Sequence, residues 1–120
     1  MPTLPGRRLE VEQVGDVTLV RLLTRSVLTE PDATSIGQML SELTEAPDCR
    51  KVVLDLGEVR SMTTMMVGQF LALHRRLEAL GGRLVICNSD RFLAEIFNIL
   101  RLPKVIRIYN SAQEALQSFA

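Results

Sequence analysis

The fold of this 120-residue chain is decided by residues 52–68, which read VVLDLGEVRSMTTMMVG. The first five residues, Val52 to Leu56, form a nearly continuous apolar run, which is typical of a strand covered on both faces of a sheet. A loop over residues 57–61 follows. The chain then spaces apolar residues as in an amphipathic helix, at Met66, Phe70, Leu73, Leu77 and Leu80. This stretch therefore predicts a buried strand that leads through a short loop into a long helix.

On the N-terminal side of this stretch, the sequence predicts a β-hairpin and one helix. Residues 8–14 alternate apolar and polar side chains, and residues 17–23 form a second, more apolar run. Gly15 and Asp16 lie between the two runs and suit a two-residue turn, because glycine adopts positive φ readily. Apolar residues at helical spacing then predict a helix over residues 31–45.

On the C-terminal side, strands and helices continue to alternate. Residues 84–87 read as another buried strand, Asp90 can cap the helix that follows, residues 105–109 read as the last strand, and Ser111 opens a terminal helix. The order ββαβαβαβα predicts an α/β fold with a mixed, mostly parallel sheet of about five strands and about four helices. Without a linker or a repeat, residues 1–120 are expected to form a single domain.

Composition excludes several classes of protein. The 14 basic and 14 acidic residues balance and the basic ones are scattered, whereas nucleic-acid binders concentrate positive charge. No apolar run approaches the roughly 20 residues of a membrane span, and residues 1–8 lack the apolar core of a signal peptide. We therefore expect a cytoplasmic protein that binds no nucleic acid and has no membrane span.

Residues able to support catalysis or metal binding are few. His74 is the only histidine, and Cys49 and Cys87 form no CxxC pair, so the sequence predicts no metal site and no cofactor. We interpret His74 as structural or solvated and Cys87 as a buried thiol, and a disulfide is not favoured without a secretory signal. Asp55 and Glu58 lack a second acid–base partner. Phosphate-binding glycine loops are absent, and we predict a protein that is not an enzyme.

The loop-to-helix joint at Thr63 and Thr64 carries the positive signal, since sites in open α/β sheets collect at the carboxyl ends of strands. Either hydroxyl can accept from a free amide of the first helical turn, so helix capping alone explains the pair. Three methionines surround it. Met66 falls on the buried stripe, whereas Met62 and Met65 are expected at the surface, where flexible thioethers suit a protein-binding face.

The same stretch resembles the central signature of the STAS domain family, in which an apolar strand with Asp leads to Asp-Ser-Ser-Gly-Leu-Gly at the start of a helix. Residues 71–77, 81–85 and 96–102 continue the resemblance. It implies the STAS fold of the bacterial anti-sigma factor antagonists. It also implies phosphorylation by an anti-sigma factor kinase at Thr64, where the family has its first serine. Thr63 stands in place of the family's aspartate and is the second candidate.

The resemblance further implies a partner-binding surface around this joint. The loop after the second strand reads Thr24 to Thr29 where the family often has Gly-x-Leu-Asp, and in relatives that loop lies on the partner face. The residues expected to bind the partner are Ser61, Met62, Thr63, Thr64, Met65, Val67, Gln69, Leu28 and Thr29.

The function implied is transcription regulation by partner switching. The expected partner is an anti-sigma factor serine/threonine kinase, and the chain is expected to be a monomer or a weak dimer. Two alternatives stay open: a constitutive interaction module, for example in a signalling complex or as a lipid-transport accessory, and an enzyme or small-ligand binder.

Overall fold

The computed structural model of the chain describes residues 9–120, so the predicted first-strand residue Arg8 and the segment 1–8 lie outside the described residues. The fold is α/β, as predicted, with a five-stranded sheet and a separate pair of very short strands. The strands are β1 (Leu9–Val14), β2 (Val17–Leu22), β3 (Ser26–Val27), β4 (Lys51–Asp55), β5 (Ser61–Met62), β6 (Arg83–Cys87) and β7 (Ile108–Tyr109).

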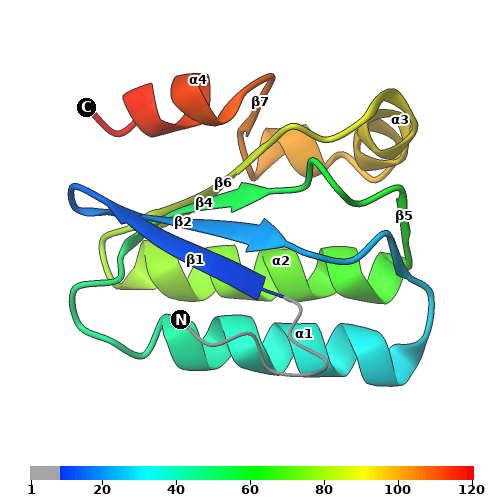
Figure 1. Ribbon diagram of the computed structural model, residues 1–120, viewed down its shortest axis with the longest axis horizontal. Helices are drawn as coiled ribbons and strands as arrows, with labels where there is room; N and C mark the ends of the chain where they lie inside the picture. The colour runs from blue at the N-terminus through cyan, green and yellow to red at the C-terminus, as the bar shows by residue number, and fades with distance from the viewer. Residues whose placement is uncertain (1–8) are drawn as a thin grey trace.

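The main sheet has the strand order β1-β2-β4-β6-β7 (Figure 1). β1 and β2 form the predicted antiparallel hairpin, and Gly15 in its turn has φ of +63°. β2, β4, β6 and β7 are mutually parallel, because a helical segment carries the chain back between each pair. The expected mixed, mostly parallel sheet is confirmed.

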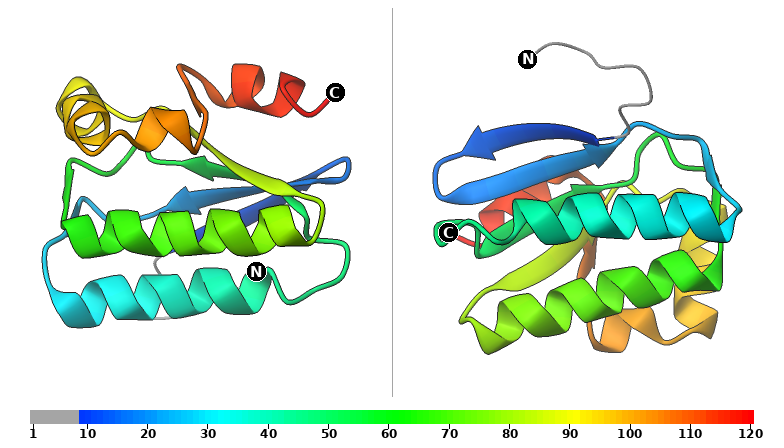
Figure 2. Two further views of the ribbon diagram at one scale, coloured as in Figure 1. Left: turned by 180° about the vertical axis from the view of Figure 1, so that it is seen from behind. Right: turned by 90° about the horizontal axis from the view of Figure 1, so that it is seen from below.

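Helices cover both faces of this sheet (Figures 1 and 2). α1 and α2 lie side by side on one face, and the later helices lie on the other. The helical segments are α1 (Glu30–Leu43), α2 (Thr64–Ala79), α3 (Arg91–Ile99), the short 3-10 helix η1 (Leu102–Lys104) and α4 (Ala112–Gln117).

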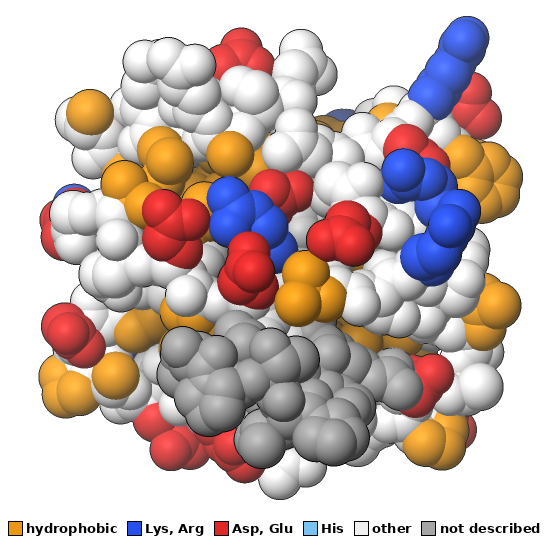
Figure 3. Space-filling view, viewed as in Figure 1, with side chains coloured by type: hydrophobic (Ala, Val, Ile, Leu, Met, Phe, Trp, Pro, Cys, Tyr) orange, Lys and Arg blue, Asp and Glu red, His pale blue; other side chains and the backbone are white. Residues whose placement is uncertain are grey.

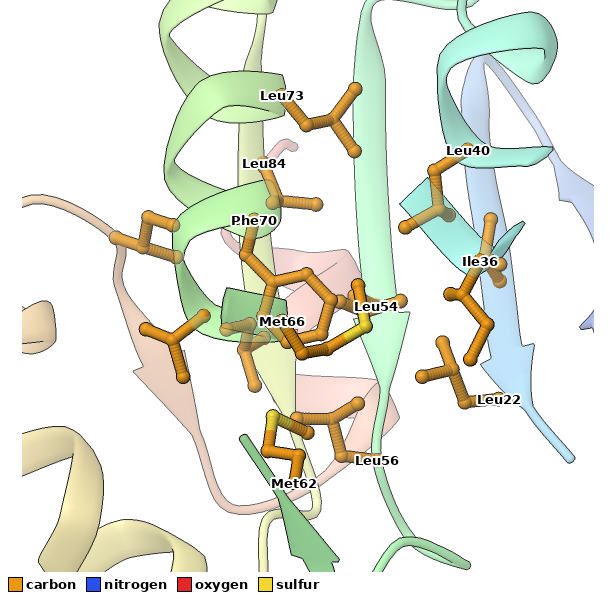
Figure 4. Close-up of a cluster of buried hydrophobic side chains, with 14 of the residues drawn as sticks. Leu22, Ile36, Leu40, Leu54, Leu56, Met62, Met66, Phe70, Leu73 and Leu84 are labelled. Carbon is orange, nitrogen blue, oxygen red and sulfur yellow. The ribbon is translucent and has the colours of Figure 1, made fainter. Parts of the chain in front are cut away.

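The core has two parts, because alternate side chains of the central strands point to opposite faces. Val52 and Leu54 of β4 join the larger cluster beneath α1 and α2, which includes Met66 and Phe70 (Figure 4). Val53 joins the smaller cluster, which Ala115 of α4 covers. This two-sided burial explains why β4 reads as a continuous apolar run.

Three features differ from the sequence-based predictions. The last strand contains only Ile108 and Tyr109, because the preceding residues form η1 and Ile106 N–H closes its turn on Leu102 C=O at 2.9 Å. β1 is more exposed than its alternation indicates, with Val11 at 39% exposure, since β1 is the edge strand. The pair formed by β3 and β5 was not predicted at all.

His74 is structural. Its side chain is 4% exposed, and its Nδ1 accepts the backbone N–H of Leu84 at 3.2 Å. Because Nδ1 is an acceptor here, the ring proton of the neutral imidazole lies on Nε2, which is 3.6 Å from the Glu78 carboxylate. The bond ties α2 directly to the central strand β6.

We predict opposite effects for two glycine substitutions. In Gly82→Ala, the new methyl group would overlap the carbonyl of Arg50, which receives the N–H of Arg83 at the start of β6. We expect a loss of roughly 1–3 kcal/mol in the free energy of unfolding, because backbone has to move. Gly68→Ala meets no atom within 4 Å inside α2, and we expect a gain of about 0.5–1 kcal/mol. Urea unfolding measures both, and a Gly82→Ala variant as stable as wild type would contradict the packing described.

Candidate functional site

The joint between β4 and α2 is held by the short parallel pair of β3 and β5. Ser26 faces Ser61 in this pair, and the Ser61 hydroxyl donates to the Ser26 hydroxyl at 3.2 Å. The N–H of Thr63 donates to the carbonyl of Val27 at 2.8 Å. These contacts fasten the start of α2 to the loop before α1. Two-residue strands have no periodicity, which is why the sequence pattern did not indicate them.

The two threonines have different roles. Thr63 is the N-cap of α2: its backbone is extended, and its Oγ1 accepts the N–H of Met66 at 3.4 Å. Thr64 is the first helical residue and its side chain is exposed. Within residues 9–120, no hydrogen bond engages the Thr64 hydroxyl. Capping therefore accounts for Thr63, whereas Thr64 presents a hydroxyl to solvent.

The three methionines differ in burial, and their spacing in the sequence predicts this difference only in part. Met66 is fully buried as predicted, and Met65 is 40% exposed. The expectation that Met62 lies at the surface is wrong. Met62 pairs with Val27 across β3 and β5, and its side chain, 7% exposed, points into the core beside Leu56 (Figure 4).

Other expected contact residues are also interior or engaged. Val67 is buried, so its side chain faces no partner. Gln69 is half-buried and packs over Gly37 of α1, where a Cβ atom would lie 2.6 Å from its Oε1. Thr29 is exposed but caps α1, and its Oγ1 accepts the N–H of Asp32 at 3.2 Å.

The remaining residues define one surface. Leu28 follows β3 just as Thr63 follows β5, which places the two side by side, and Leu28 is 62% exposed. Together with Thr64 and Met65 they form what we call the α2 entry face: Leu28, Thr63, Thr64 and Met65. The face carries no charged side chain, and the first turn of α2 contains no acidic residue.

Asp55 stabilises the loop behind this face. Its Oδ1 accepts the N–H of Gly57 at 2.8 Å and Nδ2 of Asn88 at 3.2 Å, while its Oδ2 lies 3.5 Å from Nε of Arg21. The carboxylate thus joins the ends of β2, β4 and β6. It is a structural group here, and the pairing of Asp55 with Glu58 considered from the sequence is not seen among these contacts.

Cys87 lies next to Asp55 and is poorly suited to nucleophilic chemistry. Both cysteines are buried and unpaired. Burial, with a smaller contribution from the Asp55 carboxylate, raises the pKa of the Cys87 thiol from 9.0 to about 12, and Arg21 opposes this shift. The thiolate, which is the reactive form, is therefore disfavoured at neutral pH.

Within the part of the chain that the structure describes, no three His, Cys, Asp or Glu side chains are grouped so as to hold a metal ion. No helix of residues 9–120 is both long and apolar enough to cross a bilayer.

The strand order β1-β2-β4-β6-β7, with helices on both faces of the sheet, places this chain in a class of small α/β domains. The sequence model of the STAS domain family matches residues 8–115, and the chain therefore belongs to this family.

Solved structures agree with this assignment. An anti-sigma-factor antagonist STAS protein from Planctomyces limnophilus has a TM-score of 0.82 at 19% identity, over 92% of this chain and 96% of that chain. An anti-sigma factor antagonist from Mycobacterium paratuberculosis has a TM-score of 0.81 at 16% identity, over 92% and 91%. The phosphorylated form of SpoIIAA, a Bacillus cell fate determinant, has a TM-score of 0.70 at 18% identity, over 93% and 99%. The predicted STAS fold is confirmed.

We predict that the two threonines differ in their effect on stability. Thr63→Ala removes the cap and is expected to lower the free energy of unfolding by about 1 kcal/mol, whereas Thr63→Ser retains most of it. Thr64→Ala removes an exposed side chain and is expected to change it by less than about 0.5 kcal/mol. Urea titration of the three variants measures this difference. Equal losses for Thr63→Ala and Thr64→Ala would show that the assignment of the cap is wrong.

We also predict an alkaline loss of stability that depends on Cys87. The unfolded thiol loses its proton near its ordinary pKa of 9.0, whereas the folded one keeps it up to about 12. Between these values the folded state binds more protons, so the free energy of unfolding falls as pH rises, by up to about 1.4 kcal/mol per pH unit. Relative to Cys87→Ala, wild type should lose roughly 1 kcal/mol between about pH 8 and about pH 10 in urea unfolding. Parallel pH profiles would contradict the shift.

Proposed function

We propose that this STAS domain is an anti-sigma factor antagonist-like regulator that binds a kinase-type anti-sigma factor through the α2 entry face. Phosphorylation of Thr64 switches this binding off. In this proposal residues 1–120 act as one cytoplasmic domain that is not itself an enzyme. The observation that carries the proposal is the exposed Thr64 hydroxyl, which makes no hydrogen bond within the described residues, at the start of a 16-residue helix.

The position of Thr64 suits a phosphate without loss of the fold. The first turn of a helix presents unpaired backbone N–H groups, and the helix dipole favours an anion there by about 0.3–1 kcal/mol. No acidic residue in the first turn of α2 opposes the added charge. Thr63 keeps its capping bond, because a different side chain carries the phosphate.

The same phosphate is costly in a complex. It adds about −1.5 to −2 charges next to Met65 and Leu28, which are the apolar residues of the α2 entry face. A partner that covers this face would remove water from the phosphate, and an unpaired buried charge costs several kcal/mol. Even about 3 kcal/mol corresponds to roughly a hundredfold loss of affinity. The fold therefore persists while the complex dissociates.

The known relatives support the proposal. Two of the similar structures are of anti-sigma factor antagonists, and a third is of SpoIIAA in its phosphorylated form. Those properties belong to the relatives. For this chain they make Thr64 the residue to test.

A constitutive interaction module is the second candidate. The observation that favours it is the residue before Thr64: Thr63 stands where the family signature has aspartate, and its side chain caps the helix. The Thr64 hydroxyl therefore has no carboxylate neighbour from the cap. In this case the α2 entry face would bind its partner regardless of phosphorylation.

The decisive comparison uses Thr64→Glu, which adds charge, and Thr64→Val, which keeps size and neutrality. The kinase that co-purifies with the wild-type chain is itself purified and titrated against each variant by calorimetry. We expect Thr64→Val to bind like wild type and Thr64→Glu to lose roughly a hundredfold in affinity. The melting temperature of Thr64→Glu should shift by less than about 4 °C. Thr34→Glu, at an exposed position on α1, is the matched control for added charge.

Mass spectrometry after incubation with this kinase and ATP locates the phosphate. Wild type and Thr63→Val should each acquire one phosphate, and Thr64→Val none. If Thr64→Glu binds as tightly as wild type, the switch is wrong, and the constitutive module is supported. If the phosphate is found on Thr63, the site assignment is wrong.

A further inference from the structure

α3 presents an apolar ridge that the core does not use. Phe92, Ile96 and Ile99 follow one another at i, i+4 and i+7, so they lie along one side of the helix, and we call them the α3 ridge. Leu93 and Phe97, on the neighbouring side, are fully buried and fasten α3 to the domain. The ridge is therefore not required to hold the helix in place.

Two side chains of the α3 ridge are more exposed to solvent than large apolar side chains usually are. Ile99 is 78% exposed and Phe92 is 57% exposed, and two further apolar side chains, Leu100 and Val105, are exposed just beyond the helix. Single exposed apolar residues are common, but a cluster of four within one short segment marks an interaction surface.

The charges around the α3 ridge indicate what covers it. The segment 90–107 carries four cationic side chains and two acidic ones, a net charge of +2 in a chain whose formal net charge is zero. Asp90 is occupied as the N-cap, accepting Leu93 N–H at 2.8 Å, and Glu95 lies 4.0 Å from Arg91. Within residues 9–120 no ion pair neutralises the other cations, which are Arg101, Lys104 and Arg107.

This charge disfavours a symmetric dimer through α3, because the two copies of α3 would bring like charges together. An anionic occupant is favoured. Its surface also has to accept exposed apolar side chains: Figure 3 shows hydrophobic side chains at the upper right, where Figure 1 places α3, with cationic and acidic side chains beside them. Protein contacts are usually anchored in pockets, whereas projecting Phe, Ile and Leu side chains flanked by Lys and Arg suit the interfacial region of an anionic bilayer.

We propose that α3 is a peripheral attachment site for anionic lipid. The α3 ridge, with Leu100, enters the boundary between headgroups and acyl chains, and Arg91, Arg101, Lys104 and Arg107 pair with lipid phosphates. A helix of nine residues is about 13 Å long, so it lies in the interface and does not span the bilayer. Attachment by one short helix is weak and reversible, and each cation near the surface contributes about fivefold to binding. This proposal is independent of phosphorylation at Thr64.

The test is co-sedimentation of the full chain with two kinds of vesicle: phosphatidylcholine alone, and phosphatidylcholine with phosphatidylglycerol in equal parts. We expect sedimentation with the anionic vesicles only, weakened at about 0.15 M salt because the cations are then screened. The double variant Phe92→Ser/Ile99→Ser should lose binding at least tenfold. Arg101→Glu/Lys104→Glu should lose it by more than about 25-fold, because two favourable charges are reversed. Leu80→Ser, at an exposed apolar position at the end of α2, is the matched control and should bind like wild type.

Circular dichroism melts establish whether each variant is folded. If the serine variant does not fold, the charge-reversal variant still decides the test, because it changes only exposed side chains. Absence of sedimentation with anionic vesicles at low salt would overturn the proposal. So would binding that neither double variant weakens. If the chain does not sediment with anionic vesicles and a soluble protein cross-links to α3, the α3 ridge is a protein contact and the proposal is wrong. Thr64→Glu should sediment like wild type, which separates this test from that of the proposed switch.

Discussion

One short strand, β4, constrains the rest of this protein. It is hydrogen-bonded to β2 on one edge and to β6 on the other, and its alternate side chains enter separate apolar clusters on the two faces of the sheet. Apolar side chains on both faces require helices on both faces, and parallel pairing requires a crossover before the next strand. The chain after β4 must therefore cross over through a helix, and it reaches α2 by way of β5, which places the α2 entry face at the carboxyl edge of the sheet.

The different roles of Thr63 and Thr64 at this edge of the sheet follow from hydrogen bonds with backbone groups. Because Thr63 N–H is held by Val27 and its Oγ1 by the first turn of α2, Thr63 is fixed between two elements. Thr64 comes one residue later and faces solvent. Asp55 supports the same arrangement from behind through Gly57 and Asn88. The Thr64 hydroxyl is therefore exposed beside the apolar side chains of Leu28 and Met65, which is the arrangement that the proposed switch uses.

The α2 entry face and the α3 ridge are chemically different surfaces in neighbouring parts of the fold, since α3 packs against β5. The first is uncharged and centres on a hydroxyl. The second exposes Phe92 and Ile99 and lies in the same segment as cations that have no ion pair within residues 9–120. A protein partner is the proposed occupant of the first, and anionic lipid that of the second. An occupant of α3 would lie close to the α2 entry face, so attachment would hold the proposed switch near a membrane surface.

The amino-acid sequence alone was enough to predict the order of the main helices and strands, the β-hairpin, and the helix caps at Asp90 and Ser111. Residues 52–68 were also enough to indicate membership of the STAS domain family. These features depend on local spacing, which is written in the chain. Only the tertiary structure decided that Met62 and Val67 point inward, that Gln69 packs over Gly37, and that β3 pairs with β5. Each of these depends on segments far apart in sequence, and a two-residue strand contains too few side chains for a pattern. The structure likewise separated Thr63 from Thr64, because identical side chains at adjacent positions differ only in the backbone groups that surround them.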